Sequence, residues 1–126
     1  FIYAEMPSVL AAADVVLSRA GANSLWECAV LGKPMILVPL CGSGTRGDQV
    51  DNAAFFAEKG AAIVLSGADA NEAHLKSALE KMLDSEMRQK FAESAKKISS
   101  GERPAHKIAE ILLSGCEEKN AKISDN

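Results

Sequence analysis

The chain has 126 residues, of which 48% are hydrophobic and 25% charged, and its formal net charge is −3. This size and composition are sufficient for one modest core, so we expect a single domain. The slight acidity gives no basis for nucleic-acid binding, and no apolar run approaches the roughly 20 residues that span a bilayer. Three widely spaced cysteines favour a reduced, cytosolic setting over disulfides or a zinc site.

The first residues, 1–4, are predicted to be the end of a strand. They include no initiator methionine and follow no cap, so we expect the chain to be a fragment of a longer protein. Pro7 or Ser8 is predicted to open a short helix that includes residues 9–12.

Residues 13–39 are predicted to form one strand–loop–helix–strand unit. Val15–Leu17 is short, apolar and bounded, which indicates a strand buried on both faces. Gly21 follows it, then a helix that ends at Gly32, then a second strand over residues 35–38. Open α/β sheets bind ligands at the carboxyl ends of parallel strands, so the loop around Gly21 is a candidate ligand site.

Two interpretations of this loop are open. Gly21 and Ala22 have little or no side chain, so an anion could reach the free backbone N–H groups at the helix N-terminus, where Ser24 adds a hydroxyl. A ribose diol could then donate to Glu27. Alternatively, Ser24 and Glu27 form a capping box, in which Glu27 folds back onto a backbone N–H and no ligand is needed.

The rest of the chain is predicted to be one more strand among helices. A Gly-rich loop over residues 39–47 leads to Asp48, the predicted N-cap of a helix over residues 49–59 that ends at Gly60. The later elements are a strand over residues 62–65, amphipathic helices over 71–83, 86–98 and from Pro104 onward, and a flexible polar tail over 116–126. The predicted fold class is therefore α/β, a Rossmann-like parallel sheet with flanking helices, in one domain over residues 1–115.

Several of these stretches together resemble the donor-binding half of the MurG family of glycosyltransferases. They are the small-Gly-small loop with an acid below it (residues 19–27), Gly-Lys-Pro at 32–34, Pro39, and the helix start Gly-Asp-Gln-Val-Asp-Asn-Ala at 47–53. The resemblance covers nearly the whole chain and implies the GT-B fold, in which two Rossmann-like domains face each other across a cleft. It also implies transfer of N-acetylglucosamine from UDP-GlcNAc to the lipid-linked muramyl-pentapeptide of peptidoglycan synthesis.

The resemblance implies a set of donor-binding residues: Gly21, Ala22, Asn23 and Ser24 at the diphosphate, Glu27 at the ribose, Asp48 and Gln49 at the sugar, and Tyr3, through its backbone, at uracil. Independently, the amide of Gln49 can offer a donor and an acceptor to vicinal hydroxyls. Asp48 departs from the family's usual Gln or His, and a purely capping role is the favoured alternative. Arg19 and Arg46 would either neutralise the diphosphate or form surface or interdomain salt bridges, which we favour.

The resemblance further implies that the acceptor site and catalytic base lie on an absent amino-terminal domain. We therefore expect no catalytic residue here, no activity from these 126 residues alone, and no metal, since the chain has no Asp-x-Asp motif. The full-length protein is expected in the cytoplasm, peripheral at the inner face of the membrane. The edge of an incomplete sheet also predicts self-association.

Three other functions are compatible with these residues: the donor subunit of a split UDP-GlcNAc transferase, a UDP-GlcNAc 2-epimerase-like domain, and an α/β interaction domain whose loop is merely capped. The length of the gene would identify the first, formation of UDP-ManNAc the second, and a failure to bind UDP would favour the third.

Overall fold

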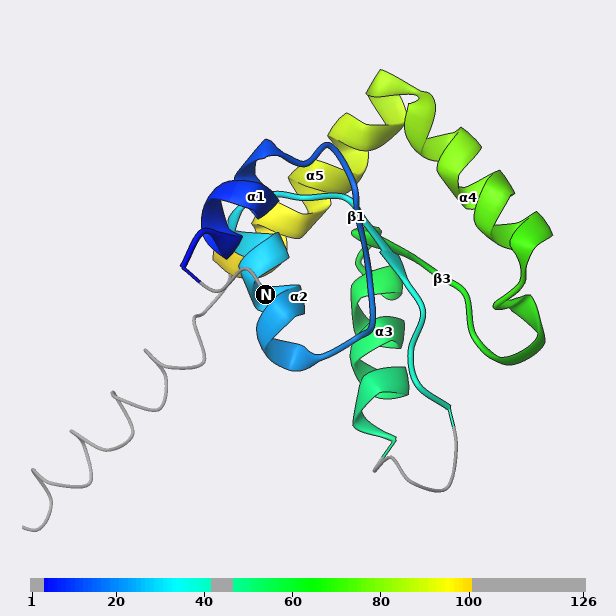
Figure 1. Cartoon of the computed structure of the whole chain (residues 1–126). Helices are drawn as coiled ribbons and strands as arrows, with labels where there is room; N and C mark the ends of the chain where they lie inside the picture. Colours follow the sequence, from blue (N-terminus) through cyan, green and yellow to red (C-terminus); the bar gives the residue numbers. More distant parts are fainter. Residues whose placement is uncertain (1–3, 42–46, 101–126) are drawn as a thin grey trace, which may run out of the picture.

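The computed structural model describes residues 4–41 and 47–100. Tyr3, Arg46, the helix predicted from Pro104 and the tail over 116–126 lie outside these residues. The elements in chain order are α1 (Met6–Ala12), β1 (Val16–Ser18), α2 (Ala22–Val30), β2 (Met35–Leu37), α3 (Asp48–Glu58), β3 (Ala62–Val64), the short 3-10 helix η1 (Gly67–Asp69), α4 (Glu72–Leu83) and α5 (Ser85–Ser100) (Figure 1).

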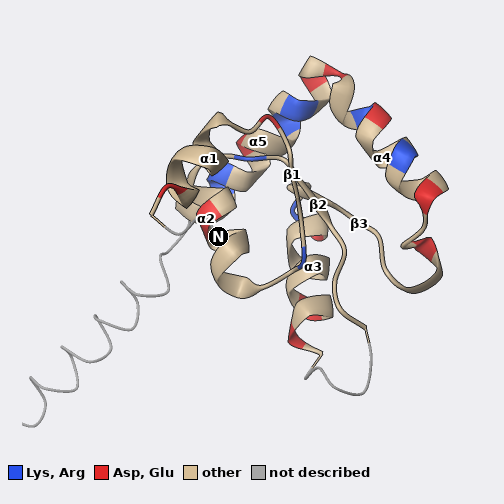
Figure 2. Ribbon diagram, in the orientation of Figure 1, with Lys and Arg blue, Asp and Glu red and all other residues tan. Residues whose placement is uncertain are grey.

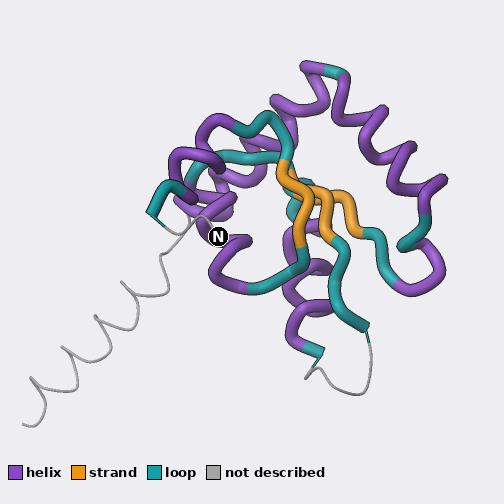
Figure 3. Tube along the Cα trace, in the orientation of Figure 1, coloured by secondary structure: helices purple, strands orange, loops and turns teal. Residues whose placement is uncertain are grey.

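The three strands form a parallel sheet in the order β1-β2-β3. Leu17 of β1 is in register with Ile36 of β2, and Ile36 with Ile63 of β3. Because all three strands run the same way, the loops that follow β1 and β2 leave the sheet at the same edge (Figure 3). The predicted α/β fold with a parallel sheet is confirmed.

Helices cover both faces of the sheet, and the alternation of side chains along β2 separates the two layers. Met35 and Leu37 pack in a cluster with residues of α2 and α3 and with Ala95 of α5. Ile36 points to the other face, where it packs with residues of α4. Figure 1 shows α4 on the opposite side of the sheet from α3. β2 is therefore fully buried, as expected for a central parallel strand.

The prediction that the first strand is buried on both faces is wrong. The strand is Val16–Ser18, and Leu17 is 51% exposed. Its pattern of apolar residues resembles that of a central strand, but within the described residues β1 has a partner on one side only. Leu83, the last residue of α4, is also largely exposed, at 77%.

Glycines end two helices as predicted. Gly32 follows α2 and Gly60 follows α3, each in the left-handed region, with φ of 62° and 73°. The prediction that Asp48 is the N-cap of α3 is wrong, because Gly47 occupies that position with φ of 75° and Asp48 is the first helical residue. Among the helices of the described residues, none is both long and apolar enough to cross a membrane.

Candidate functional site

The N-terminus of α2 presents backbone amides toward open space. Gly21 is the N-cap and makes no side-chain cap, and the first helical hydrogen bond runs from Leu25 N–H to the Gly21 carbonyl, 3.1 Å. The N–H groups of Ala22, Asn23 and Ser24 come before that bond in the chain. They donate to no acceptor within the described residues. With the positive end of the helix dipole behind them, these amides form a candidate anion site.

The capping box is the interpretation that the structure excludes. Ser24 is the third residue of α2 rather than its N-cap, and its side chain is exposed. Glu27 lies one turn further along the helix and is also exposed, and within the described residues its carboxylate accepts no hydrogen bond from a backbone N–H. Ser24 and Glu27 are therefore both available to a ligand.

Gly21 leaves the approach to these amides open. Its φ of −70° and ψ of 132° are values that any residue adopts, so the fold does not require glycine here. A Cβ built on Gly21 would meet no atom within 4 Å. The missing side chain thus leaves room in front of the loop, which allows a ligand to approach the backbone closely.

A groove of about 520 Å³ runs between α1 and α2 beside this N-terminus. Its lining residues are Pro7, Leu10, Asn23, Trp26, Glu27, Val30 and Leu31. Trp26 is half-buried: its ring packs edge-on against Phe56, with centroids 5.9 Å apart, and it also lines the groove. An apolar groove with a carboxylate in its wall suits a nucleoside, whose base is flat and whose ribose offers two hydroxyls.

A smaller hollow of about 420 Å³ lies at the carboxyl ends of β1 and β2, between Ser18 and Cys41. Arg19 lines this hollow and is exposed. Within the described residues it forms no ion pair, so the surface salt bridge predicted for it is absent there. Its guanidinium is therefore available beside the anion site.

Two side-chain hydrogen bonds join the start of α3 to the loops that follow β1 and β2. The side-chain oxygen of Gln49 accepts a hydrogen bond from the backbone N–H of Leu40, 3.0 Å. The amide nitrogen of Asn52 donates to the carbonyl of Ala20, 3.2 Å. Asn52 is part of the motif at the start of this helix, but sequence analysis assigned it no role of its own. Its spacing of three residues from Gln49 places both side chains on one helix face.

The bond to Leu40 reduces what Gln49 can offer to a ligand without removing either kind of group. It uses one lone pair of the side-chain oxygen, which leaves the second lone pair and the two amide N–H groups for a sugar hydroxyl. Asp48, which precedes Gln49, is exposed and adds carboxylate oxygens that can accept further hydrogen bonds.

Charge separates the roles of the two helix N-termini. The first turn of α2 contains no acidic residue, whereas that of α3 contains Asp48 and Asp51 (Figure 2). Carboxylates repel an anion but accept hydrogen bonds from hydroxyls. A phosphate group is therefore favoured at α2, and a group rich in hydroxyls at α3.

Two observations concern reactive groups within the described residues: the state of a buried thiol and the absence of a metal-binding cluster. Burial raises the pKa of the Cys28 thiol; the carboxylate of Glu27 adds to this effect and the ammonium of Lys33 opposes it. The thiol stays protonated at neutral pH and is a poor nucleophile. Within the same residues, no group of three His, Cys, Asp or Glu side chains could hold a metal. The arrangement can bind and orient a ligand.

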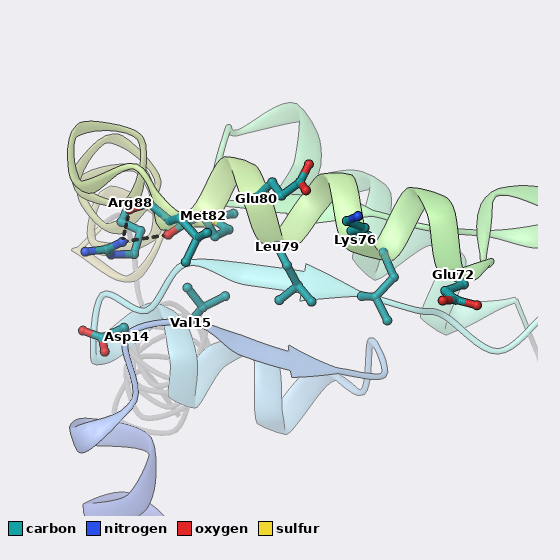
Figure 4. A pocket seen from close by; sticks show the side chains of 10 residues that line it. Asp14, Val15, Glu72, Lys76, Leu79, Glu80, Met82 and Arg88 are labelled. Carbon is teal, nitrogen blue, oxygen red and sulfur yellow. Dashed lines mark hydrogen bonds between the residues drawn. The ribbon is translucent and has the colours of Figure 1, made fainter.

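A larger groove, of about 600 Å³, lies between β1 and α4 (Figure 4). Its walls include Val15 and Leu79, and Arg88 at one end donates hydrogen bonds to the carbonyls of Met82 and Leu83, both 2.8 Å. It contains none of the predicted ligand residues. We therefore place the candidate site at the N-termini of α2 and α3.

Comparisons with known proteins identify the family of the chain and agree with its fold. The model of the glycosyltransferase family 28 C-terminal domain matches residues 1–110. A Treponema denticola protein named UDP-N-acetylglucosamine–N-acetylmuramyl-(pentapeptide) pyrophosphoryl-undecaprenol N-acetylglucosamine transferase is 43% identical over 128 aligned residues, which cover 98% of this chain and 33% of that protein. A protein of the same name from Treponema pallidum is 59% identical over 69 residues, which cover 55% of this chain and 18% of that protein.

A solved structure shares the fold. Spinosyn forosaminyltransferase SpnP superposes with a TM-score of 0.65 over 89% of this chain and 28% of that chain, at 23% identity. The chain thus spans a third or less of the length of these proteins. Since the family model covers most of its residues, the chain belongs to the glycosyltransferase family 28 C-terminal domain family.

Proposed function

We propose that this chain is the donor-binding part of an inverting glycosyltransferase that transfers N-acetylglucosamine from UDP-GlcNAc to a lipid-linked muramyl-pentapeptide in peptidoglycan synthesis. The observation that carries the proposal is the uncapped N-terminus of α2 beside a groove that contains Glu27. This pairs an anion site with an acid one helical turn further on, the two groups that a nucleoside diphosphate requires. The names of the relatives from Treponema supply the donor and acceptor.

In this proposal each part of the donor meets a different part of the site. The amides of Ala22, Asn23 and Ser24 bind the diphosphate, and Arg19 adds charge from the neighbouring hollow. Glu27 accepts hydrogen bonds from the ribose hydroxyls. The sugar lies over the start of α3, and the uridine base lies toward α1. Tyr3 and Arg46, which were predicted at the base and the phosphates, lie outside the described residues.

The rest of the reaction belongs to the remainder of the longer protein. We propose that the lipid-linked acceptor and the catalytic base are held there, that transfer needs no metal, and that these 126 residues alone bind donor without turning it over. We place the full-length enzyme in the cytoplasm, at the inner face of the membrane where its acceptor lies. We also propose that the open edge of β1 lets isolated chains associate.

Titration of the chain with UDP, followed by backbone amide NMR shifts up to millimolar concentrations, tests the proposal. Saturable shifts are expected at residues 21–27. Glu27→Ala should weaken UDP binding about tenfold or more, because a charged acceptor is worth roughly 1.5–3 kcal/mol. Glu58→Ala, which removes an exposed carboxylate from the far end of α3, is the matched control. Unchanged affinity in Glu27→Ala, or no shifts in the wild type, would contradict the proposal.

A further inference from the structure

The helix α1 forms one wall of the groove but is weakly anchored by its own packing. It has seven residues, and none of them is buried. Leu10 is half-buried and packs against the core cluster under α2, and with Pro7 it lines the groove opposite Asn23 and Glu27. So short a helix has little stability of its own. Its position must depend on contacts from outside the helix.

Lys33 supplies such a contact. Its ammonium donates hydrogen bonds to the carbonyls of Ala11, 2.6 Å, and Ala13, 2.9 Å, at the carboxyl end of α1. Carbonyls in a last helical turn have no partner within the helix and carry the negative end of its dipole. A half-buried cation there satisfies two acceptors and opposes that partial charge.

The backbone of Lys33 is itself fixed to α2. Gly32 takes the left-handed conformation after the helix, its N–H donates to the Ala29 carbonyl, 3.0 Å, and the N–H of Lys33 donates to the Cys28 carbonyl, 2.8 Å. This is the paired bonding of a Schellman motif. Lys33 therefore leaves α2 at a defined point, and its side chain links the end of α2 to the end of α1.

We propose that Lys33 is a positioning residue that sets the width of the groove between α1 and α2, and thereby the affinity for the nucleoside part of the donor. The inference rests on the proposed function for its ligand. Lys33 does not line the groove; it acts through α1, whose Pro7 and Leu10 face Glu27 across it. The bound diphosphate contacts the opposite end of α2, so Lys33 should influence the nucleoside and not the phosphates.

The test compares Lys33→Met, which keeps the apolar stem and removes the ammonium, with the wild type. Amide hydrogen exchange of α1 should accelerate about tenfold while that of α4 and α5 is unchanged, since a hydrogen bond to a charged group is lost. UDP should bind about tenfold more weakly, whereas inorganic pyrophosphate, which lacks the nucleoside, should bind as it does to the wild type. Lys33→Arg should restore both values in part. Lys81→Met, a lysine removed from the last turn of α4, is the matched control.

Each contrary outcome has a distinct meaning. Unchanged exchange in α1 overturns the inference whatever UDP does. Faster exchange in α1 with unchanged UDP affinity overturns the role in the groove and leaves the proposed function standing. Equal losses of UDP and pyrophosphate binding also overturn it, because they indicate a general structural effect. If the wild-type chain bound UDP no more tightly than pyrophosphate, both the inference and the nucleoside site of the proposed function would be refuted.

Discussion

Gln49 has one role in the fold and a second, proposed role at the sugar. Its oxygen accepts the hydrogen bond from Leu40 N–H, whereas its two amide N–H groups take no part in that bond. The two roles can therefore be separated by substitutions that keep one half of the amide and change the other.

Gln49→Glu keeps an acceptor for Leu40 but loses both donors. We expect its free energy of unfolding to stay within about 0.5 kcal/mol of the wild type, while its affinity for UDP-GlcNAc falls to that for UDP. Gln49→Met removes the bond to Leu40 and should cost about 1 kcal/mol of stability. Urea denaturation and parallel titrations with UDP and UDP-GlcNAc provide the measurements. Retained preference for UDP-GlcNAc in Gln49→Glu would show that Gln49 does not read the sugar.

For individual residues, local features could be predicted from the sequence and bonding partners could not. Small residues at a helix start and an acid one turn further on are local features, and the structure places Gly21 at the N-cap of α2 with Glu27 exposed. The bonds from Gln49 to Leu40 and from Asn52 to Ala20 join residues that are 9 and 32 positions apart. No local pattern encodes such pairs, so the roles of these two amides could not be foreseen.

At the scale of elements, the turn after α2 depends on one glycine more than on any other residue. Gly32 has φ of 62°, and a Cβ there would clash with the side chain of Lys96 on α5. α2 and α5 pack against each other, so this turn joins the two helices closely. A side chain at this position is disfavoured by its backbone conformation and must also displace Lys96.

Gly32→Ala should therefore lower the free energy of unfolding by about 1–2 kcal/mol from the left-handed backbone alone. Gly21→Ala is the matched comparison, because Gly21 has an ordinary φ and no atom within 4 Å of its added Cβ; it should change stability by less than about 0.5 kcal/mol. Chemical denaturation of both variants measures the difference. Equal stability of the two variants would contradict the argument.

Apart from the 3-10 helix η1, which was not predicted, the order and type of the described elements were predicted from the sequence because periodicity and glycine stops are local properties. Their ends were less certain. The capping-box interpretation placed Ser24 at the N-cap of α2, but the helix begins two residues before Ser24, at Ala22. Ala22 and Asn23 adopt helical conformation as readily as Ser24 does. The burial of β1 was mistaken because a strand's own residues do not state how many neighbouring strands it has.

At the scale of the whole molecule, the sheet of the described residues has two edge strands, β1 and β3, and β1 is the one bordered by exposed apolar side chains. β1 is an edge strand, Leu17 is 51% exposed, and Leu79 of α4 is 44% exposed above the groove beside it (Figure 4). Unpaired strand amides next to apolar side chains favour pairing with another chain. In a solution of isolated chains, the partner most readily available to β1 is a strand from a second copy.

We expect the average mass of the chain in light scattering to rise with concentration. Leu17→Lys should reduce this rise, because a charge on an edge strand disfavours pairing. Phe55→Lys, at a residue of α3 that is 42% exposed and away from this edge, should not. A strictly monomeric wild type at high concentration, or equal effects of the two substitutions, would argue against association through β1.

The bonds made by α3 have a consequence for changing the donor. Gln49 and Asn52 tether two separate loops to one helix, so any substitution that breaks either hydrogen bond would also disturb the architecture. Asp48 stands beside them, exposed and outside that tethering. Directed evolution toward another hexose would therefore best begin by randomising Asp48, where a new side chain can contact the sugar while the scaffold keeps its shape.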